Sequence, residues 1–425
     1  MLDPALAPRL LKAVDDGFDE QVKFLADLTR IPSLRCEEAT AQDFMADAMR
    51  RRGLAVDRWK VNVDDIAHLP GFSPVAVSYE NAWNVVGTHR PRKASGRSLI
   101  LNGHIDVVPT GPADMWTRPP FDAYVADGWM YGRGAGDMKA GLAANLFAMD
   151  AFKRIGLAPA AEVYQQSVIE EECTGNGALA CLQRGYRGDA AIITEPQSES
   201  LLRAQVGVMW FQVKVRGRPA HVAVAGTGAN AIEACFPITK ALHELEHRWN
   251  ETGHPAFSIH AHPINFVVSR IEGGDWTSSV PAWCTFDMRI SLFPGMGLAD
   301  VRRQVEDTVA KAAAADAFLS ANPPQVVYHG FQAEGYELPR GTECEATLAR
   351  CHTAVTGEAL KDNACTGTTD ARFFGLYAGI PSMVYGPHAE NIHAFDERVN
   401  LESVRRVTKT VALFIADWCG VEAAA

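Results

Sequence analysis

Side chains able to bind a cation or move a proton follow three short apolar runs in the first half of the sequence. In order, these are residues 99–102 followed by His104 and Asp106, residues 162–169 followed by Glu171 and Glu172, and residues 189–193 followed by Glu195. If the runs are neighbouring parallel strands, their carboxyl ends meet at one edge of a sheet, where open α/β folds bind ligands. The order therefore predicts a single cluster of histidine and carboxylate groups.

The spacing within two of these segments fits a metal centre with a separate base. His104 and Asp106 alternate along an extended segment, so both side chains point to one side, as a ligating histidine and its supporting carboxylate require. Residues 170–172 are three adjacent glutamates, which repel one another strongly unless a cation lies among them. Alternation sends Glu171 and Glu172 to different sides, so one can bind metal while the other remains a free base. For each motif alone, a capped strand end or a solvated acidic loop is the plain alternative.

Two further loops supply another carboxylate and another histidine. Asp137 lies in the glycine-rich segment 131–141, which lacks the glycine pattern of a dinucleotide site and the G-K-[ST] ending of a phosphate loop. His393 lies in a polar loop after the apolar run 381–385. Histidine and carboxylate ligands without cysteine suit zinc, manganese or cobalt, and two ions bridged by one carboxylate need about this many groups.

A competing metal motif lies within a predicted helix. His243, Glu244 and His247 match H-E-x-x-H, in which two histidines share a helix face and the glutamate is the base of a single-zinc endopeptidase. The longer metzincin motif fails, because Asn250 and Gly253 stand where a glycine and a third histidine are needed. A solvated amphipathic helix face explains the same residues without a metal, and we favour that interpretation.

The pattern of apolar residues predicts that an α/β fold positions these groups. Helical periodicity covers residues 7–29, 40–53, 138–154, 341–356 and 401–418, and short β-rich runs cover residues 54–61, 84–88, 98–102, 162–169, 189–193 and 381–385. Helices that alternate with strands indicate a mixed, mostly parallel sheet flanked by helices.

The middle of the chain has a different order of predicted strands and helices. Strands are predicted at residues 207–215, 263–271, 279–290 and 325–328, and helices at residues 229–249 and 298–315. This order is typical of a small antiparallel sheet with two helices on one face. We therefore predict a catalytic domain formed by residues 1–203 and 334–425, with residues 204–333 inserted as an α+β lid.

The composition excludes several classes of partner. The 425 residues include 40 Lys and Arg against 51 Asp and Glu, a net charge of −11 without a local basic patch, so we expect no nucleic-acid or membrane partner. No apolar run reaches the roughly 18 residues that cross a bilayer, and the acidic N-terminal segment does not resemble a signal peptide. The nine cysteines are scattered without a C-x-x-C pair, which favours a reducing, cytoplasmic location.

Taken in order, five segments resemble the motifs of the M20 metallopeptidase family, which includes aminoacylases, acetylornithine and succinyl-diaminopimelate deacylases, and glutamate carboxypeptidases. They are residues 103–106, 136–139, 171–172, 195–196 and His393, and the resemblance spans nearly the whole chain. It implies a zinc-exopeptidase-like catalytic domain with an inserted dimerisation lid. It also implies a cis peptide bond after Asp137.

The resemblance assigns a role to each residue of the predicted cluster. Asp137 would bridge two divalent ions, most readily zinc, with cobalt or manganese possible. His104 and Glu195 would complete one metal site, and Glu172 and His393 the other. Asp106 would hold the imidazole of His104, which fixes its tautomer. Glu171 would be the general base, taking a proton from the attacking water and delivering it to the leaving amine.

The resemblance also marks residues outside the cluster. His221 resembles a lid histidine that reaches the active site of a partner subunit, which implies a homodimer. Asn265, Arg289 and Arg372 resemble residues that hold the carboxylate or amide of the substrate, since the planar arginine fork binds both oxygens of a carboxylate. Structural ion pairing, or a polar residue at a strand end, is the alternative for these four.

The expected reaction is hydrolysis of an amide bond in a small N-acyl substrate, most simply an N-acyl amino acid. Family members that cleave peptides with a free amino end tend to carry aspartate where this chain has Glu195, which favours deacylation or carboxypeptidase-type cleavage of dipeptides. Deformylation of a formylaminopyrimidine, as in thiamine salvage, is the leading alternative. A catalytically inactive binding protein is the alternative from another class, although Glu171 and all five expected ligands are present.

Overall fold

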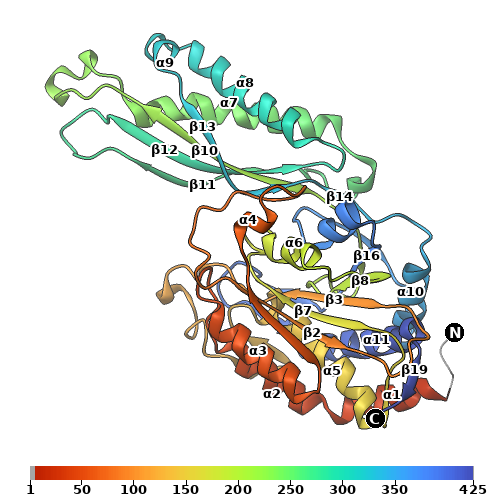
Figure 1. Ribbon diagram of the computed structural model, residues 1–425. Coiled ribbons are helices and arrows are strands. Elements are labelled where there is room, and N and C mark those ends of the chain that lie inside the picture. Colours follow the sequence, from red (N-terminus) through yellow and green to blue (C-terminus); the bar gives the residue numbers. More distant parts are fainter. Residues whose placement is uncertain (1–4, 425) are drawn as a thin grey trace.

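A mixed nine-stranded sheet forms the centre of the larger part of the protein in the computed structural model, which describes residues 5–424 (Figure 1). The strand order is β1 (Ala55–Lys60), β2 (Trp83–His89), β7 (Val163–Val168), β3 (Leu99–His104), β8 (Ala190–Ile193), β16 (Ser382–Val384), β9 (Leu201–Gln205) and β14 (Tyr336–Glu337), with β15 (Asp362–Cys365) beside β9. The central strands β7, β3, β8 and β16 are parallel, whereas β1, β2 and β14 pair antiparallel with their neighbours. The predicted mostly parallel sheet therefore describes its centre.

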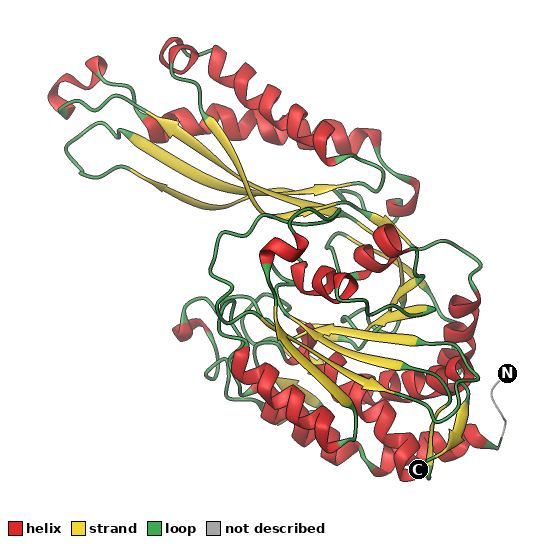
Figure 2. Ribbon diagram, viewed as in Figure 1, coloured by secondary structure: helices red, strands yellow, loops and turns green. Residues whose placement is uncertain are grey.

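Helices cover both faces of this sheet (Figure 2). One face carries α1 (Leu6–Asp16), α2 (Phe18–Thr29), α3 (Ala39–Arg51), α5 (Ala140–Arg154) and α11 (Leu401–Cys419), and the other carries α4 (Val63–Ile66) and α6 (Asn176–Gln183). α10 (Glu343–Thr356) packs beside α11. The prediction of a single helix over residues 7–29 is wrong, because the structure has two helices separated by Gly17. A Cβ atom at Gly17 would lie 2.8 Å from the side chain of Arg154, so this position favours glycine.

A second, four-stranded sheet projects from the first part as a separate layer, which we call the lid (residues 207–333). Its antiparallel order is β11 (Phe266–Gly273), β12 (Trp283–Leu292), β10 (Gly207–Arg216) and β13 (Gln325–Ala333), and helices α7 (Ala231–Thr252), α8 (Leu298–Ala314) and α9 (Ala317–Ala321) cover one face. The lid has its own core, in which Phe211 and Phe286 face Ile238 and Val305. The domain limits predicted from the sequence stay a prediction.

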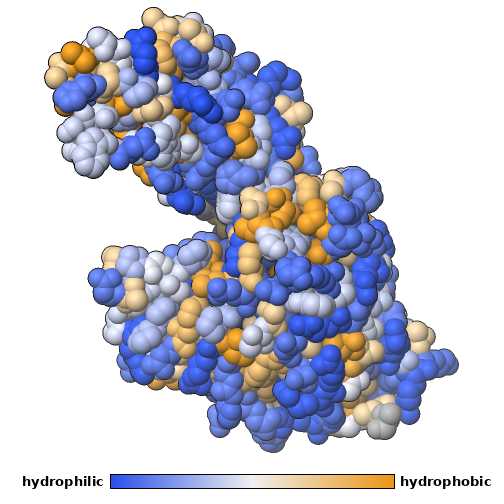
Figure 3. Space-filling view, turned by 60° about the vertical axis from the view of Figure 1, so that its left-hand side comes forward, coloured by the Kyte–Doolittle hydropathy of each residue, from blue (hydrophilic) through white to orange (hydrophobic). Residues whose placement is uncertain are grey.

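A small sheet brings the end of the chain against its first third. Its order is β17 (Ala389–Glu390), β18 (Arg398–Asn400), β5 (Trp129–Tyr131) and β4 (Tyr124–Ala126). The pairing of β18 with β5 places the loop 391–397 beside the loop 132–139. Strands β6 (Leu157–Pro159) and β19 (Val421–Ala423) form a further pair. The molecule is hollowed between the lid and the larger part (Figure 3).

No helix in the described part of the chain combines the length and the apolar character needed to span a membrane.

Candidate metal centre

Three parallel strands end at the same edge of the central sheet, as the sequence predicts. β3 lies between β7 and β8 and ends at His104. The segments that follow β7 and β8 carry Glu171, Glu172 and Glu195, and all three approach the imidazole of His104. The structure therefore brings the three predicted strand ends together.

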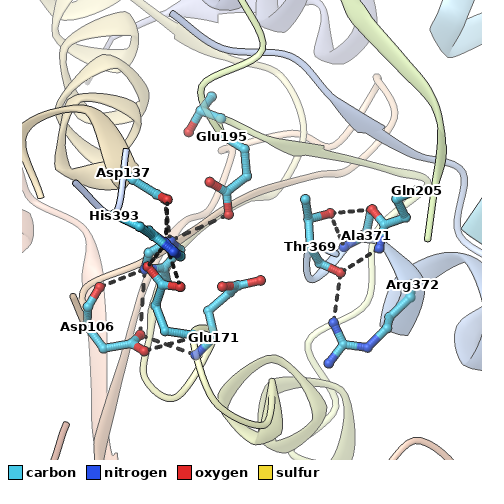
Figure 4. A network of polar contacts seen from close by, with 12 residues as sticks. Asp106, Asp137, Glu171, Glu195, Gln205, Thr369, Ala371, Arg372 and His393 are labelled. Carbon is cyan, nitrogen blue, oxygen red and sulfur yellow. Dashed lines mark hydrogen bonds and ion pairs between the residues drawn. The ribbon is translucent and has the colours of Figure 1, made fainter. Parts of the chain in front are cut away.

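Asp137 lies between two histidines from distant parts of the chain (Figure 4). Its Oδ1 is 3.1 Å from Nε2 of His104, and its Oδ2 is 3.4 Å from Nε2 of His393. Each histidine also approaches a different glutamate: His104 Nε2 lies 3.5 Å from Glu195 Oε1, and His393 Nε2 lies 3.1 Å from Glu172 Oε2. This is the arrangement in which one carboxylate faces two separate ligand sets. The Asp137–Met138 peptide bond is cis.

The donor atoms fit divalent cations. Within residues 5–424, the groups of three or more ligand atoms close enough to share an ion are His104 with Glu171 and Glu195, and His104 with Asp137 and Glu172. Oxygen and imidazole donors without thiolate suit zinc, cobalt and manganese. Glu171, which we expect to act only as a base, is therefore close enough to His104 and Glu195 to share an ion with them. His393 lies in neither group. It contacts Asp137 and Glu172, and half of its side chain is exposed.

The pKa shifts within the cluster show which groups burial keeps neutral and which groups their neighbours keep charged. Burial raises the pKa of Glu171 and of Glu195 well above the usual range, since neighbouring carboxylates add to its effect. Burial also opposes ionisation of Asp137, but hydrogen bonds from His104 and His393 outweigh it and lower the pKa of this carboxyl. For His393, burial favours the neutral ring, yet Glu172 and Asp137 raise its pKa to about 11. A buried excess of carboxylates of this kind is stabilised by cations.

Asp106 supports both the histidine and the glutamates. Its backbone oxygen accepts a hydrogen bond from Nδ1 of His104 at 2.9 Å, whereas its carboxylate Oδ1 is 3.6 Å from that nitrogen. The carboxylate instead accepts the backbone N–H groups of Glu171 and Glu172, at 3.2 and 3.1 Å. Burial raises the pKa of Asp106 to about 7. Asp106 therefore fixes the loop that carries the expected base and an expected ligand.

A comparison with protein-family models identifies the family of the chain that carries this cluster. A family model described as peptidase family M20/M25/M40 matches residues 100–417. The chain belongs to this family. The predicted family is confirmed, and membership makes the protein an amide-bond hydrolase.

Relatives of this M20 chain resemble it over nearly their whole length. An N-formyl-4-amino-5-aminomethyl-2-methylpyrimidine deformylase of Halalkalibacterium halodurans is 30% identical, with 99% of each chain covered. A succinyl-diaminopimelate desuccinylase of Cereibacter sphaeroides is 28% identical, with 94% of this chain and 99% of the relative covered. Among solved structures, the di-peptidase Dug1p of Saccharomyces cerevisiae has a TM-score of 0.78 at 15% identity, with 97% of this chain and 98% of that chain covered. The shared architecture confirms the predicted fold class.

A second set of contacts, which the sequence did not reveal, holds the residue before the expected base. Glu170 has a positive φ of 64° and a buried carboxylate that forms an ion pair with Arg35. The hydroxyl of Tyr79 donates to the same carboxylate at 2.8 Å, and that of Thr174 donates at 3.1 Å. The run of three glutamates was a signal that one of them needs a cationic partner, but nothing in the spacing indicates Arg35.

The predicted substrate-binding residues of this M20 chain lie in different surroundings. His221 is exposed on the lid, where its Nδ1 accepts the N–H of Ala223, and Asn265 donates to the backbone oxygen of Pro263. Neither has a hydrogen bond to the cluster among the described residues. Arg372 is fully buried and donates to the backbone oxygens of Thr369 and Thr174 (Figure 4).

Arg289 differs from Arg372 in being only partly buried, on strand β12 of the lid, from which it reaches the segment after β15. Its guanidinium donates to Ser291 Oγ at 2.5 Å and to the backbone oxygen of Thr366 at 3.2 Å. Burial lowers the pKa of Arg289, and no carboxylate of the described residues forms an ion pair with it.

The H-E-x-x-H segment lies on α7, away from the sheet edge. His243 Nδ1 lies 2.7 Å from Glu246 Oε2, and His262 Nε2 lies 2.8 Å from the other oxygen of Glu246. Glu244 is exposed, 3.8 Å from Lys240. In the part of the chain that the structure describes, this helix supplies no cluster of ligand atoms. His243 and His262 share the carboxylate of Glu246, and the ring of His247 packs against that of His262.

Proposed function

We propose that this protein hydrolyses the amide bond of a small N-acyl compound with two divalent metal ions, most readily zinc, or alternatively cobalt or manganese. The observation that carries the proposal is that the two carboxylate oxygens of Asp137 face two different histidines, each of which approaches a different glutamate. In this assignment His104, Asp137 and Glu195 hold one ion, and Asp137, Glu172 and His393 hold the other. When bound, the ions polarise the amide carbonyl and stabilise the negative charge that develops on its oxygen.

Glu171 is the proton carrier in this proposal. Its Oε1 is buried without a hydrogen-bond partner in the described part of the chain, and burial raises its pKa well above the usual range, which favours the protonated state that the carrier must reach during the reaction. It takes a proton from the attacking water and gives it to the leaving amine. Asp106 keeps this carboxylate in place through the Glu171 backbone N–H.

Two observations point to different acyl compounds. The deformylase of Halalkalibacterium halodurans resembles this chain from end to end, which favours an N-formyl aminomethylpyrimidine. The partly buried guanidinium of Arg289, which lacks a carboxylate partner among the described residues, favours a substrate with its own carboxylate, such as an N-acyl amino acid. A bidentate arginine pair would orient such a substrate.

A substrate panel tests both candidates. Metal-loaded protein is incubated with N-formyl-4-amino-5-aminomethyl-2-methylpyrimidine, and with N-formyl, N-acetyl and N-succinyl amino acids and dipeptides, and products are followed by mass spectrometry. Glu171→Gln is the control that must abolish turnover. Arg289→Met raises KM for carboxylate-bearing compounds and leaves KM for the pyrimidine unchanged. If wild type with two bound metals cleaves none of these compounds, the proposed function is wrong.

We also propose that the protein is a homodimer in which His221 stabilises the oxyanion in the active site of the partner subunit. His221 is exposed, and it belongs to the lid, whose sheet is separate from the central sheet that carries the cluster; both observations support this assignment. Mixing inactive His221→Ala and Glu171→Ala proteins should restore part of the activity through hybrid dimers. Subunit exchange without any recovered activity would remove the shared site.

We place the enzyme in the cytoplasm. All nine cysteines are free, and most are buried. Free thiols in this number are typical of a reducing compartment.

A further inference from the structure

A buried ion pair lies behind the candidate metal centre. Arg133 NH1 is 2.6 Å from Glu397 Oε2, and both side chains are at most 2% exposed. The partners are 264 positions apart in the sequence. Each belongs to a loop that carries an expected ligand: Arg133 precedes Asp137, and Glu397 follows His393. The ion pair therefore joins two loops that the sequence leaves unconnected.

The second carboxylate oxygen of Glu397 holds the Asp137 loop. Glu397 Oε1 accepts the backbone N–H of Gly136 at 3.0 Å and that of Asp137 at 3.1 Å. The backbone oxygen of Glu397 accepts the N–H of Gly132 at 2.9 Å. The carboxylate of Glu397 thus accepts hydrogen bonds from the backbone of Asp137, the expected bridging residue, and from the guanidinium of Arg133.

The guanidinium of Arg133 holds the loop on the other side. Its NH2 donates to the backbone oxygen of Ala394, the residue after His393, at 3.2 Å, and to that of Pro109 at 3.4 Å. His393 itself has a positive φ of 62°, an unusual backbone conformation for a residue other than glycine. Such a conformation persists only where the surroundings hold it. Arg133 supplies part of that support.

We propose that Arg133 and Glu397 are positioning residues that fix Asp137 relative to His393, and so determine how tightly the ion between Asp137, Glu172 and His393 is held. The inference rests on the proposed function. It goes beyond it by assigning a role to two residues that touch neither metal nor substrate. Groups that orient ligands from behind typically change metal affinity by about 10–100-fold when they are removed.

The test is a cobalt(II) titration of metal-free protein, followed by the d–d absorption of the bound ion and by equilibrium dialysis. Wild type is expected to bind two ions. Glu397→Ala should weaken the second ion by about 10–100-fold and the first by much less, because the loop that carries His393 is held only at the second site, whereas His104 and Glu195 keep their positions at the first. Glu397→Gln should restore most of this affinity, since its amide oxygen still accepts the two backbone N–H groups.

Glu345→Ala is the matched control. Glu345 also pairs with an arginine, Arg203, and accepts a backbone N–H from Gly341 at 3.1 Å, but it lies at the start of α10 outside both metal-ligand loops. It should lower the melting temperature without changing the cobalt titration. If Glu397→Ala leaves Arg133 buried without a partner and does not fold, Arg133→Met/Glu397→Met removes both charges together and should fold with the same weakened ion.

The outcomes separate the inference from the function. Two ions bound with wild-type affinity by folded Glu397→Ala, or by the double methionine variant, would overturn the positioning role and leave the proposed function intact. Failure of wild type to bind cobalt or zinc would overturn both. Loss of the second ion in the Glu345→Ala control would show a general effect of destabilisation, and would also overturn the specific role.

Discussion

The sheet edge and helix α7 both carry residue types that bind metals, yet only the sheet edge brings them together. At the edge, five separate segments supply the expected ligands His104, Asp137, Glu172, Glu195 and His393, with carboxylates in excess of histidines. On α7, one carboxylate, Glu246, is shared by His243 and His262, both of which are more than 40% exposed. The polar groups of the motif on α7 satisfy one another without a cation, whereas the cluster at the sheet edge has more carboxylates than histidines can compensate.

The difference shows that spacing along one helix is weaker evidence for a metal than convergence at one buried place. Two imidazoles and the one buried carboxylate between them satisfy one another by ordinary hydrogen bonds. Several buried carboxylates repel one another, and burial in a medium of low polarity makes that repulsion costly. A cation is the simplest way to remove this cost.

The largest test of this comparison concerns the two candidate bases. Glu171→Gln should lower kcat by about 10²–10⁴-fold, because a neutral amide cannot accept the proton from water. Glu244→Gln should leave kcat within experimental error of wild type, since Glu244 is exposed beside Lys240. Both are measured at saturating metal on the substrate that the panel identifies. An inactive Glu244→Gln with full metal content would restore the single-zinc endopeptidase interpretation.

The next test compares two histidines. His393→Ala should retain one tightly bound ion of the two after dialysis, because it removes one nitrogen ligand that no other side chain replaces. His247→Ala should retain both, since its ring only packs against that of His262. Metal content is measured by inductively coupled plasma mass spectrometry. Equal loss in the two variants would mean that the lid also holds metal.

Much of the fold could be predicted because the apolar runs are long enough to show a period. β3, β7, β8 and the helices α5 and α11 lie where the pattern indicates them. The direction of β1 and β2 could not be predicted, since strand pairing depends on the path of the connections. The strands β17 and β18, of two and three residues, are too short to show any period, although they bring His393 to Asp137.

The residues of the candidate site could be named from the sequence, but not what holds them. His104, Glu171 and Glu195 follow buried strands, and parallel strands must bring their ends together. The hydrogen bonds of Asp106 to two backbone N–H groups depend on the exact course of the loop after β7. The same is true of the contacts of Glu397, because a loop conformation is set by tertiary packing and leaves no periodic signal.

The smallest test uses the pH dependence of stability of the metal-free protein at the sheet edge. Glu38 is buried, its Oε2 lacks a hydrogen-bond partner in the described part of the chain, and burial, together with the charge of Asp106, raises its pKa from 4.5 to about 8. Between these values the folded protein binds a proton that the unfolded chain has lost, so stability falls as pH rises. Glu38→Gln carries no group that titrates in this range, so it removes this fall of stability with rising pH. We expect it to raise the free energy of unfolding at pH 6 by about 2 kcal/mol relative to wild type, and by little at pH 4.

Glu246 should behave in the opposite way, which completes the comparison. Burial opposes its ionisation, but hydrogen bonds from His243 and His262 outweigh this and lower its pKa below the usual 4.5. Its stabilising contribution is therefore present above pH 4.5 and is lost as pH falls through the lowered pKa. Glu246→Gln should lower the free energy of unfolding by about 1 kcal/mol at pH 6, measured by urea denaturation alongside Glu38→Gln. If both substitutions changed stability with the same sign, the sheet edge would hold no more uncompensated negative charge than the helix, and the electrostatic argument for a cation there would fail.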